Sequence, residues 1–133
     1  MREILFRGKR KDNGEWAFGY FALITEDDRP AIRVRESDWH SWVDVSPETV
    51  GQFTGLSDKN KKKIFDGDIL LAPNKKKAVV SFGTYSPYIG SPGADTFECW
   101  KLKVGNNECP LTKTISVEME IIGNIYDNPE LIS

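Results

Sequence analysis

Histidine, cysteine and long apolar runs are scarce in this chain of 133 residues. It has one histidine, His40, and two cysteines, Cys99 and Cys109. These are too few for a four-ligand zinc site or a disulfide framework, so we expect reduced thiols, no metal and no cofactor. No window approaches the ~20 apolar residues of a membrane span, and the charged N-terminus lacks the apolar core of a secretory signal. We therefore expect a cytoplasmic protein with no membrane partner.

An excess of either charge is also missing. The chain has 18 Lys and Arg against 20 Asp and Glu, a formal net charge of -2. This balance argues against wholesale coating of nucleic acid, so any such binding must come from a local patch. The length suffices to bury roughly two-thirds of the unfolded surface. We expect one domain over residues 1–133, whose two halves would be an N-terminal β lobe, 1–52, and a C-terminal β-barrel lobe, 53–133.

Helical spacing of apolar residues is absent over the ten or more positions that a stable helix needs. Strand patterns are abundant instead. Residues 3–10 and 15–25 flank Asn13-Gly14 and predict a hairpin, because Asn-Gly supplies the positive φ angles of a tight turn. The run AIRVRE (31–36) predicts a strand with a basic, solvent-facing side. The run ISVEMEII (115–122) alternates apolar and polar residues and predicts an amphipathic strand.

Between these strands the turn residues are frequent. Pro47 is placed to begin a short helical turn with Ser46 as its cap. The Gly-, Ser- and Pro-rich segment 83–95 predicts a long loop, and Cys109 before Pro110 also indicates a loop. Six to nine short strands with short helical turns only predict an all-β fold. It would be a small barrel or sandwich of mostly antiparallel strands, SH3-like in the second half as one form.

The densest charge pattern lies in residues 54–70, TGLSDKNKKKIFDGDIL. Asp58 is suited to accept a hydrogen bond from an N–H two residues on, and Asn60 tolerates the left-handed conformation. Asp66 and Gly67 predict a second tight turn. A catalytic or metal-binding pair of Asp66 and Asp68 would need further partners that the sequence does not supply. We favour turn formation, and we predict no catalytic residue, no small-molecule substrate and no enzyme.

Lysines are the better functional lead. Two clusters follow each other closely, and if they flank a common edge they form a basic spot on an acidic protein. Such a spot on a small β protein is suited to hold nucleic acid through phosphate contacts. The alternative, which we favour from sequence alone, is that exposed lysines only keep strand edges soluble. The candidate residues are Lys59, Lys61, Lys62, Lys63, Lys75, Lys76 and Lys77.

Aromatic residues are the second lead. His40 lies between two tryptophans, and a lone histidine there is more often packed or exposed than catalytic. The tryptophans and the tyrosines of the long loop are candidates for protein contact, with core or subunit packing as the alternative. These candidates are Trp39, Trp42, Tyr85 and Tyr88. The partner would be a second copy of the chain, giving a homo-oligomer, or another protein.

Three blocks of the chain, REILFRGKR, ETVGQFTGLSDKNKKKIFDGDIL and EIIGNIYDNPEL, together resemble the YopX family of small phage and prophage proteins. The central block is similar to the family pattern T-G-L-x-D-K-N-G-x-x-I-[YF]-[ED]-G-D-I, except that Lys61 replaces a glycine. The resemblance implies a mainly β fold in a bacterial host and supplies no activity or site residue. We therefore expect a non-enzymatic module that acts by binding as a homo-oligomer, with nucleic acid or a host protein as the alternative partner.

Overall fold

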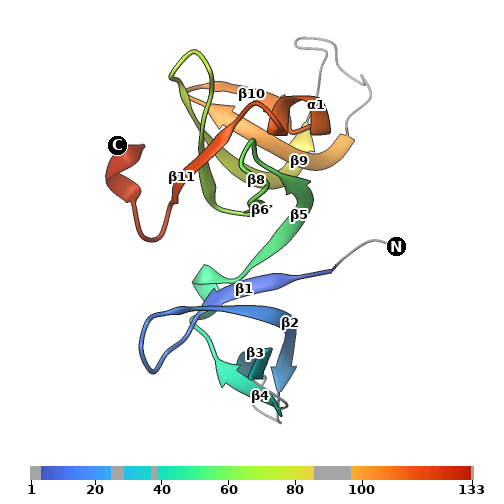
Figure 1. The fold of residues 1–133 in the computed structure, drawn as a ribbon, viewed down its shortest axis with the longest axis vertical. Helices are drawn as coiled ribbons and strands as arrows, with labels where there is room; N and C mark the ends of the chain where they lie inside the picture. Colours follow the sequence, from blue (N-terminus) through green and yellow to red (C-terminus); the bar gives the residue numbers. More distant parts are fainter. Residues whose placement is uncertain (1–3, 25–28, 37–38, 86–96, 133) are drawn as a thin grey trace. The chain divides into compact units, whose positions relative to one another are not determined.

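The described part of the chain is almost entirely β-structure. The computed structural model describes residues 4–24, 29–36, 39–85 and 97–132. Their strands form two antiparallel sheets, of six and five strands (Figure 1). The strands are β1 (Phe6–Lys9), β2 (Trp16–Ile24), β3 (Arg29–Glu36), β4 (Trp39–Asp44), β5 (Gly51–Ser57), β6 (Lys63–Phe65), β7 (Asp68–Leu71), β8 (Lys77–Tyr85), β9 (Phe97–Val104), β10 (Asn107–Pro110) and β11 (Glu120–Asn124). The predicted mainly β fold is confirmed.

Helical structure in these residues is brief. The 3-10 turn η1 (Pro47–Thr49) begins at the predicted proline, although the Ser46 side chain makes no capping bond. A second 3-10 turn, η2 (Pro129–Leu131), and the helix α1 (Lys113–Ser116) complete the described helices. None is long and apolar enough to cross a membrane. Contacts between Cα atoms divide the chain into two units, residues 1–55 and 56–133; the predicted lobes stay a prediction.

The first sheet has the order β4-β3-β2-β1-β5-β6, and its predicted hairpin of β1 and β2 is confirmed. Gly14 in the connecting turn has φ 74°. The strand β2 pairs with β1 up to Gly19 and with β3 from Tyr20 onward. A Cβ on Gly19 would lie 1.9 Å from the Arg33 carbonyl oxygen, so glycine is required at this crossing. One side of these strands forms a buried cluster around Ala17, Ile32 and Val45.

The second sheet has the order β10-β9-β8-β7-β11 and holds the larger buried cluster. Its buried side chains include residues that are opposite each other on neighbouring strands. Leu70 is opposite Ala78, and Val80 is opposite Leu102. Burying such side chains contributes about 1.5–3 kcal/mol for each large one. In the residues that the structure describes, the strand order of both sheets is open, and no closed barrel is found.

Three local predictions are wrong. Residues 115–122 do not form one strand: α1 covers Lys113–Ser116, and β11 begins only at Glu120. The cause is a helix cap that outweighs the alternating pattern, because the Thr112 side chain accepts a hydrogen bond from the Ile115 N–H (3.2 Å).

The other two concern predicted loops. Cys109 lies in β10, where Pro110 is tolerated because this is an edge strand. Residues 83–85 belong to β8, since Gly83 pairs with Cys99 and Tyr85 with Phe97. Cys99 and Cys109 are free thiols, as expected. The rest of the predicted long loop lies outside the described residues.

Candidate functional site

The first lysine cluster lies on a turn, residues 58–62, that Asp58 organises. The Lys61 N–H donates to the Asp58 carbonyl (3.0 Å), and the Asp58 N–H donates to the Lys62 carbonyl (2.9 Å). The Asp58 carboxylate, 3% exposed, accepts from the N–H groups of Asn60 (2.8 Å), Lys62 (2.9 Å) and Ile121 (3.0 Å). The predicted bond to the second following residue is confirmed. The left-handed residue, however, is Lys61, with φ 65°, and not Asn60.

The second cluster lies on a turn, residues 72–76, of the same kind. The Lys75 N–H donates to the Ala72 carbonyl (2.8 Å), and the Ala72 N–H donates to the Lys76 carbonyl (2.9 Å). Asn74 replaces the aspartate as the side-chain acceptor, bonding the Lys76 N–H at 3.0 Å. Lys75 has φ 72° and is the left-handed residue, as Lys61 is in the first turn. Both turns therefore place a lysine at the position where three-residue hairpin loops usually have glycine.

Strand register brings the two turns to the same end of the second sheet. The Lys59 N–H donates to the Met119 carbonyl (2.9 Å), which attaches the first turn to the start of β11. At that end, Glu120 of β11 is opposite Leu71 of β7, which is opposite Lys77 of β8. Since neighbouring strands are about 4.8 Å apart, the row from β11 to β8 spans about 10 Å. The two lysine clusters therefore converge, as the nucleic-acid hypothesis requires.

We call this surface the lysine end, and its seven lysines are all exposed. Lys59 forms an ion pair with Glu120 at 3.2 Å. Both partners are solvated, so the pair contributes little stability. The buried Asp58 is already engaged in three backbone hydrogen bonds. The lysine end consists of Lys59, Lys61, Lys62, Lys63, Lys75, Lys76 and Lys77.

In the sequence Asp66-Gly67-Asp68, the second aspartate accepts a hydrogen bond from the backbone. Asp68 is 2% exposed, and its Oδ2 accepts a hydrogen bond from the Phe65 N–H at 2.8 Å. Gly67 has φ 90°, and its N–H donates to the Val80 carbonyl. The predicted tight turn is therefore present. Among the described residues, no group of three His, Cys, Asp or Glu side chains is arranged to hold a metal ion.

The aromatic candidates divide between described and undescribed positions. The Trp42 side chain on β4 is 43% exposed, and Tyr85 ends β8 as a half-buried residue opposite Phe97. Tyr88 and the side chain of Trp39 lie outside what the structure describes. Protein contact through these residues stays a prediction.

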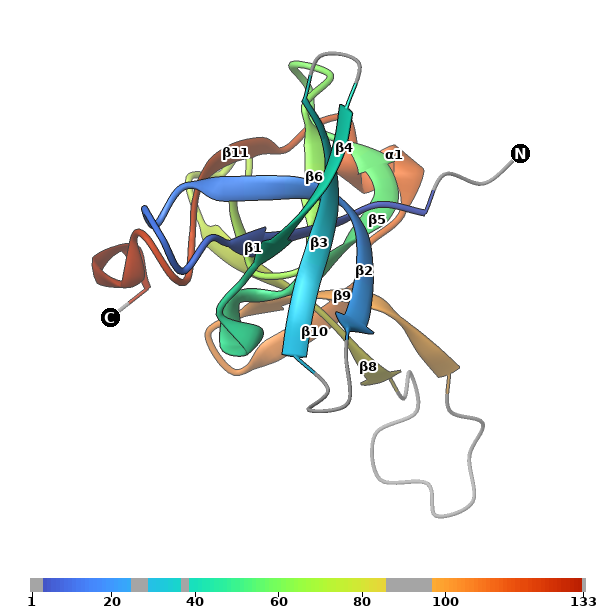
Figure 2. The ribbon, with the colours of Figure 1, turned by 90° about the horizontal axis from the view of Figure 1, so that it is seen from below.

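A surface that the sequence did not predict lies on the side of the first sheet opposite its buried cluster. The strands β2, β3 and β4 are neighbours in this sheet (Figure 2). Tyr20 of β2 is opposite Arg33 of β3, which is opposite Trp42 of β4. Phe18 is two residues from Tyr20 and shares its side. The side chains of Phe18 and Tyr20 are 48% and 67% exposed. In the sequence, this surface is indicated only by the alternating aromatic residues of WAFGYF and the arginines of RVR. The strand register that brings them together cannot be inferred from the sequence.

Further cationic residues continue this side onto β1. The Arg7 guanidinium carbon lies 4.6 Å from the centroid of the Trp16 ring, and the Lys9 Nζ lies 5.6 Å from it. Such distances correspond to cation–π contact. Aromatic and cationic side chains therefore alternate across four strands. We call this surface the aromatic face, and it consists of Lys9, Trp16, Phe18, Tyr20, Arg33 and Trp42; Arg7, 7% exposed, is buried and is not part of it.

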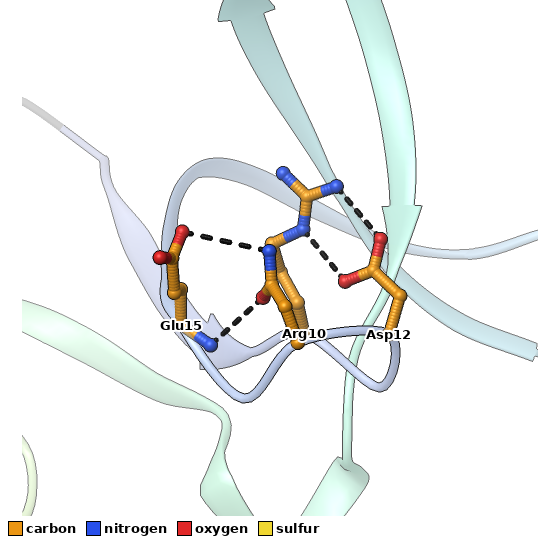
Figure 3. Close-up of polar contacts among 4 residues, drawn as sticks. Arg10, Asp12 and Glu15 are labelled. Atoms are coloured by element: carbon orange, nitrogen blue, oxygen red, sulfur yellow. Dashed lines mark hydrogen bonds and ion pairs between the residues drawn. The ribbon is translucent and has the colours of Figure 1, made fainter.

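An open groove of about 580 Å³ adjoins Trp42, and ion pairs line it. The Arg10 guanidinium donates to both carboxylate oxygens of Asp12, at 3.0 and 2.9 Å (Figure 3). This contact lowers the pKa of Asp12. Arg29 pairs with Asp44 at 2.8 Å, and Lys11 also lines the groove. The groove therefore places two ion pairs and Lys11 beside an exposed indole ring.

Comparison with known proteins agrees with the resemblance seen in the sequence. The YopX protein family matches residues 5–133, and no curated protein matches the chain. The crystal structure of protein EF1440 from Enterococcus faecalis is similar, with a TM-score of 0.54, 19% sequence identity and all of both chains covered. At that identity the likeness shows the fold alone. Because the family match spans nearly the whole sequence, the chain belongs to the YopX family.

Proposed function

We propose that the protein acts by binding rather than by catalysis, and that the lysine end holds the phosphate backbone of a nucleic acid. The observation that supports this proposal is the convergence of seven exposed lysines, from two turns and the first residues of the strands that follow them, at one end of the second sheet. Phosphate contacts by lysine dominate the affinity of nucleic-acid binding and carry no sequence information. The expected binding is therefore insensitive to sequence.

Backbone conformation adds support. A left-handed conformation costs an L-residue roughly 1–2 kcal/mol, and the lysine end contains two such residues, Lys61 and Lys75. Glycine would fit both positions without this strain. Lysine at these two positions lowers the stability of the fold and adds positive charge. This combination is consistent with a role for the charge itself.

The direct test is binding of a fluorescein-labelled 20-nucleotide strand, followed by fluorescence anisotropy between 50 and 200 mM salt. If three to five phosphates of the single strand are contacted, affinity should fall roughly 20- to 130-fold over this range. Lys62→Glu and Lys76→Glu should each weaken binding and reduce the salt slope by about one. Lys113→Glu, an identical charge change on α1, is the control and should bind as the wild type does.

Affinity that ignores salt, or an equal effect of the control substitution, would refute a role for the lysine end. Self-association and capture of a host protein stay predictions. Gel filtration with light scattering tests the first, and a strict monomer at micromolar concentration would exclude it. Pull-down with Tyr85→Ala tests the second, because an unchanged capture would place the contact elsewhere.

A further inference from the structure

We infer that the aromatic face stacks the bases of the bound nucleic acid, so that the protein prefers a single strand to a duplex. The inference rests on the proposed nucleic-acid function but uses a different surface in a different unit of the chain. Its starting point is the exposure of three large rings, Phe18, Tyr20 and Trp42, on one side of one sheet. Exposed aromatic residues that gather on one surface indicate a binding site rather than ordinary surface scatter.

The order of side chains across the strands suggests what the occupant is. Tyr20, Arg33 and Trp42 form a row over β2, β3 and β4, in which a cation separates two rings. The two outer strands of the row are about 10 Å apart, which leaves each ring open to a separate planar partner. Nucleic-acid bases offer such planar partners, and the phosphates between successive bases suit the intervening arginine.

Charge on this surface favours a polyanion over an uncharged apolar partner. The aromatic face includes the cations Lys9 and Arg33. Asp44, two residues from Trp42 and on the same side of β4, is paired with Arg29 at 2.8 Å. The groove beside Trp42 adds Lys11 and the paired Arg10 at the margin of the row. The positive charge of Arg33, which is exposed between the two rings, therefore complements a polyanion.

Unpaired bases fit this surface better than a duplex does. In a duplex the faces of the bases are covered by their neighbours, and exposing them requires unstacking at a cost of a few kcal/mol per step. In a single strand the faces are accessible, and side-chain rings on a sheet stack them directly. Duplex affinity should then depend on the lysine end alone, whereas single-strand affinity should depend on both surfaces.

The test compares Tyr20→Ala and Trp42→Ala for binding of a labelled 20-residue oligothymidylate and of a labelled 20-base-pair duplex. Each substitution should weaken oligothymidylate binding roughly 5- to 150-fold, the effect of one lost base–ring stack, and leave duplex binding unchanged. Trp42→Phe keeps a ring and should retain most of the affinity. Phe97→Ala is the matched control, because Phe97 is 55% exposed but belongs to β9 of the second sheet. Far-ultraviolet circular dichroism checks that each variant is folded.

The outcomes separate the two proposals. Equal, salt-dependent binding of strand and duplex by the wild type and both alanine variants would overturn stacking and leave the lysine end intact. Loss of oligothymidylate binding in the alanine variants with wild-type binding in Lys62→Glu and Lys76→Glu would support stacking and refute the lysine end. No binding of either probe at 50 mM salt would overturn both. Self-association that Trp42→Ala abolishes, without any nucleic-acid binding, would assign the aromatic face to a second copy of the chain.

Discussion

Replacing Lys61 with glycine should stabilise the protein, because Lys61 has φ 65° in a turn whose hydrogen bonds require that conformation. The left-handed region costs an L-residue roughly 1–2 kcal/mol, which glycine avoids. Glycine in turn loses about 0.5–1 kcal/mol more conformational entropy on folding. The expected net gain in the free energy of unfolding is therefore about 0.5–1 kcal/mol. For a chain of this size, such a gain raises Tm by about 2–4 °C.

Thermal unfolding followed by circular dichroism measures this gain, and urea titration provides an independent value. Lys61→Ala is the matched control, since alanine also removes the lysine side chain but keeps the strain of a Cβ at positive φ. Lys62→Gly is the second control, because it adds the entropic cost of glycine at a position without positive φ, and it should destabilise. If Lys61→Gly is no more stable than Lys61→Ala, the strain assigned to this turn is wrong.

Three further predictions follow from other parts of the chain. Gly19→Ala should destabilise the first unit by about 3 kcal/mol or more, measured by urea unfolding, because its Cβ would lie 1.9 Å from the Arg33 carbonyl oxygen. In an NMR titration the pKa of Asp12 should lie below its ordinary value and rise toward it in Arg10→Ala. The stability from this pair should be present above the unfolded-state pKa and be lost as the pH falls through the lowered pKa of the folded state. The Cys109 thiol should react slowly with iodoacetamide at neutral pH, because burial raises its pKa, and unfolding in urea should speed the reaction.

The sequence predicted those parts of the fold that depend on local chemistry. Asn13-Gly14 produced the hairpin, Asp58 accepted the predicted N–H, and Gly67 took the predicted positive φ. In each case one or two neighbouring residues decide the conformation. The alternating run 115–122 led to a wrong prediction. The helix cap at Thr112 lies outside this run, and it stabilises α1, which includes the first two residues of the run.

The aromatic face shows what local pattern could not predict. Whether Tyr20 and Trp42 share a surface depends on which strands pair and in which register, and both are set by contacts distant in sequence. Trp42 was a predicted contact residue because it is one of the two tryptophans that flank His40, whereas Tyr20 was predicted only as part of a strand. From the sequence, convergence of the two lysine clusters was only a condition that nucleic-acid binding would require. The structure meets this condition because Glu120 of β11 and Lys77 of β8 both lie opposite Leu71 of β7.

The departure of Lys61 from the family pattern has a stronger meaning beside the second turn. One lysine at a glycine-like position could reflect tolerance, because a loss of about 1 kcal/mol is within what a folded domain withstands. Lys75 repeats the same conformation in a turn of the same hydrogen-bond pattern, at the same end of the sheet. Strain retained at two positions that share a surface and a charge indicates a common cause at that surface. If the lysine end binds phosphate, Lys61→Gly and Lys75→Gly should each raise stability and weaken nucleic-acid binding, so that the two properties change in opposite directions.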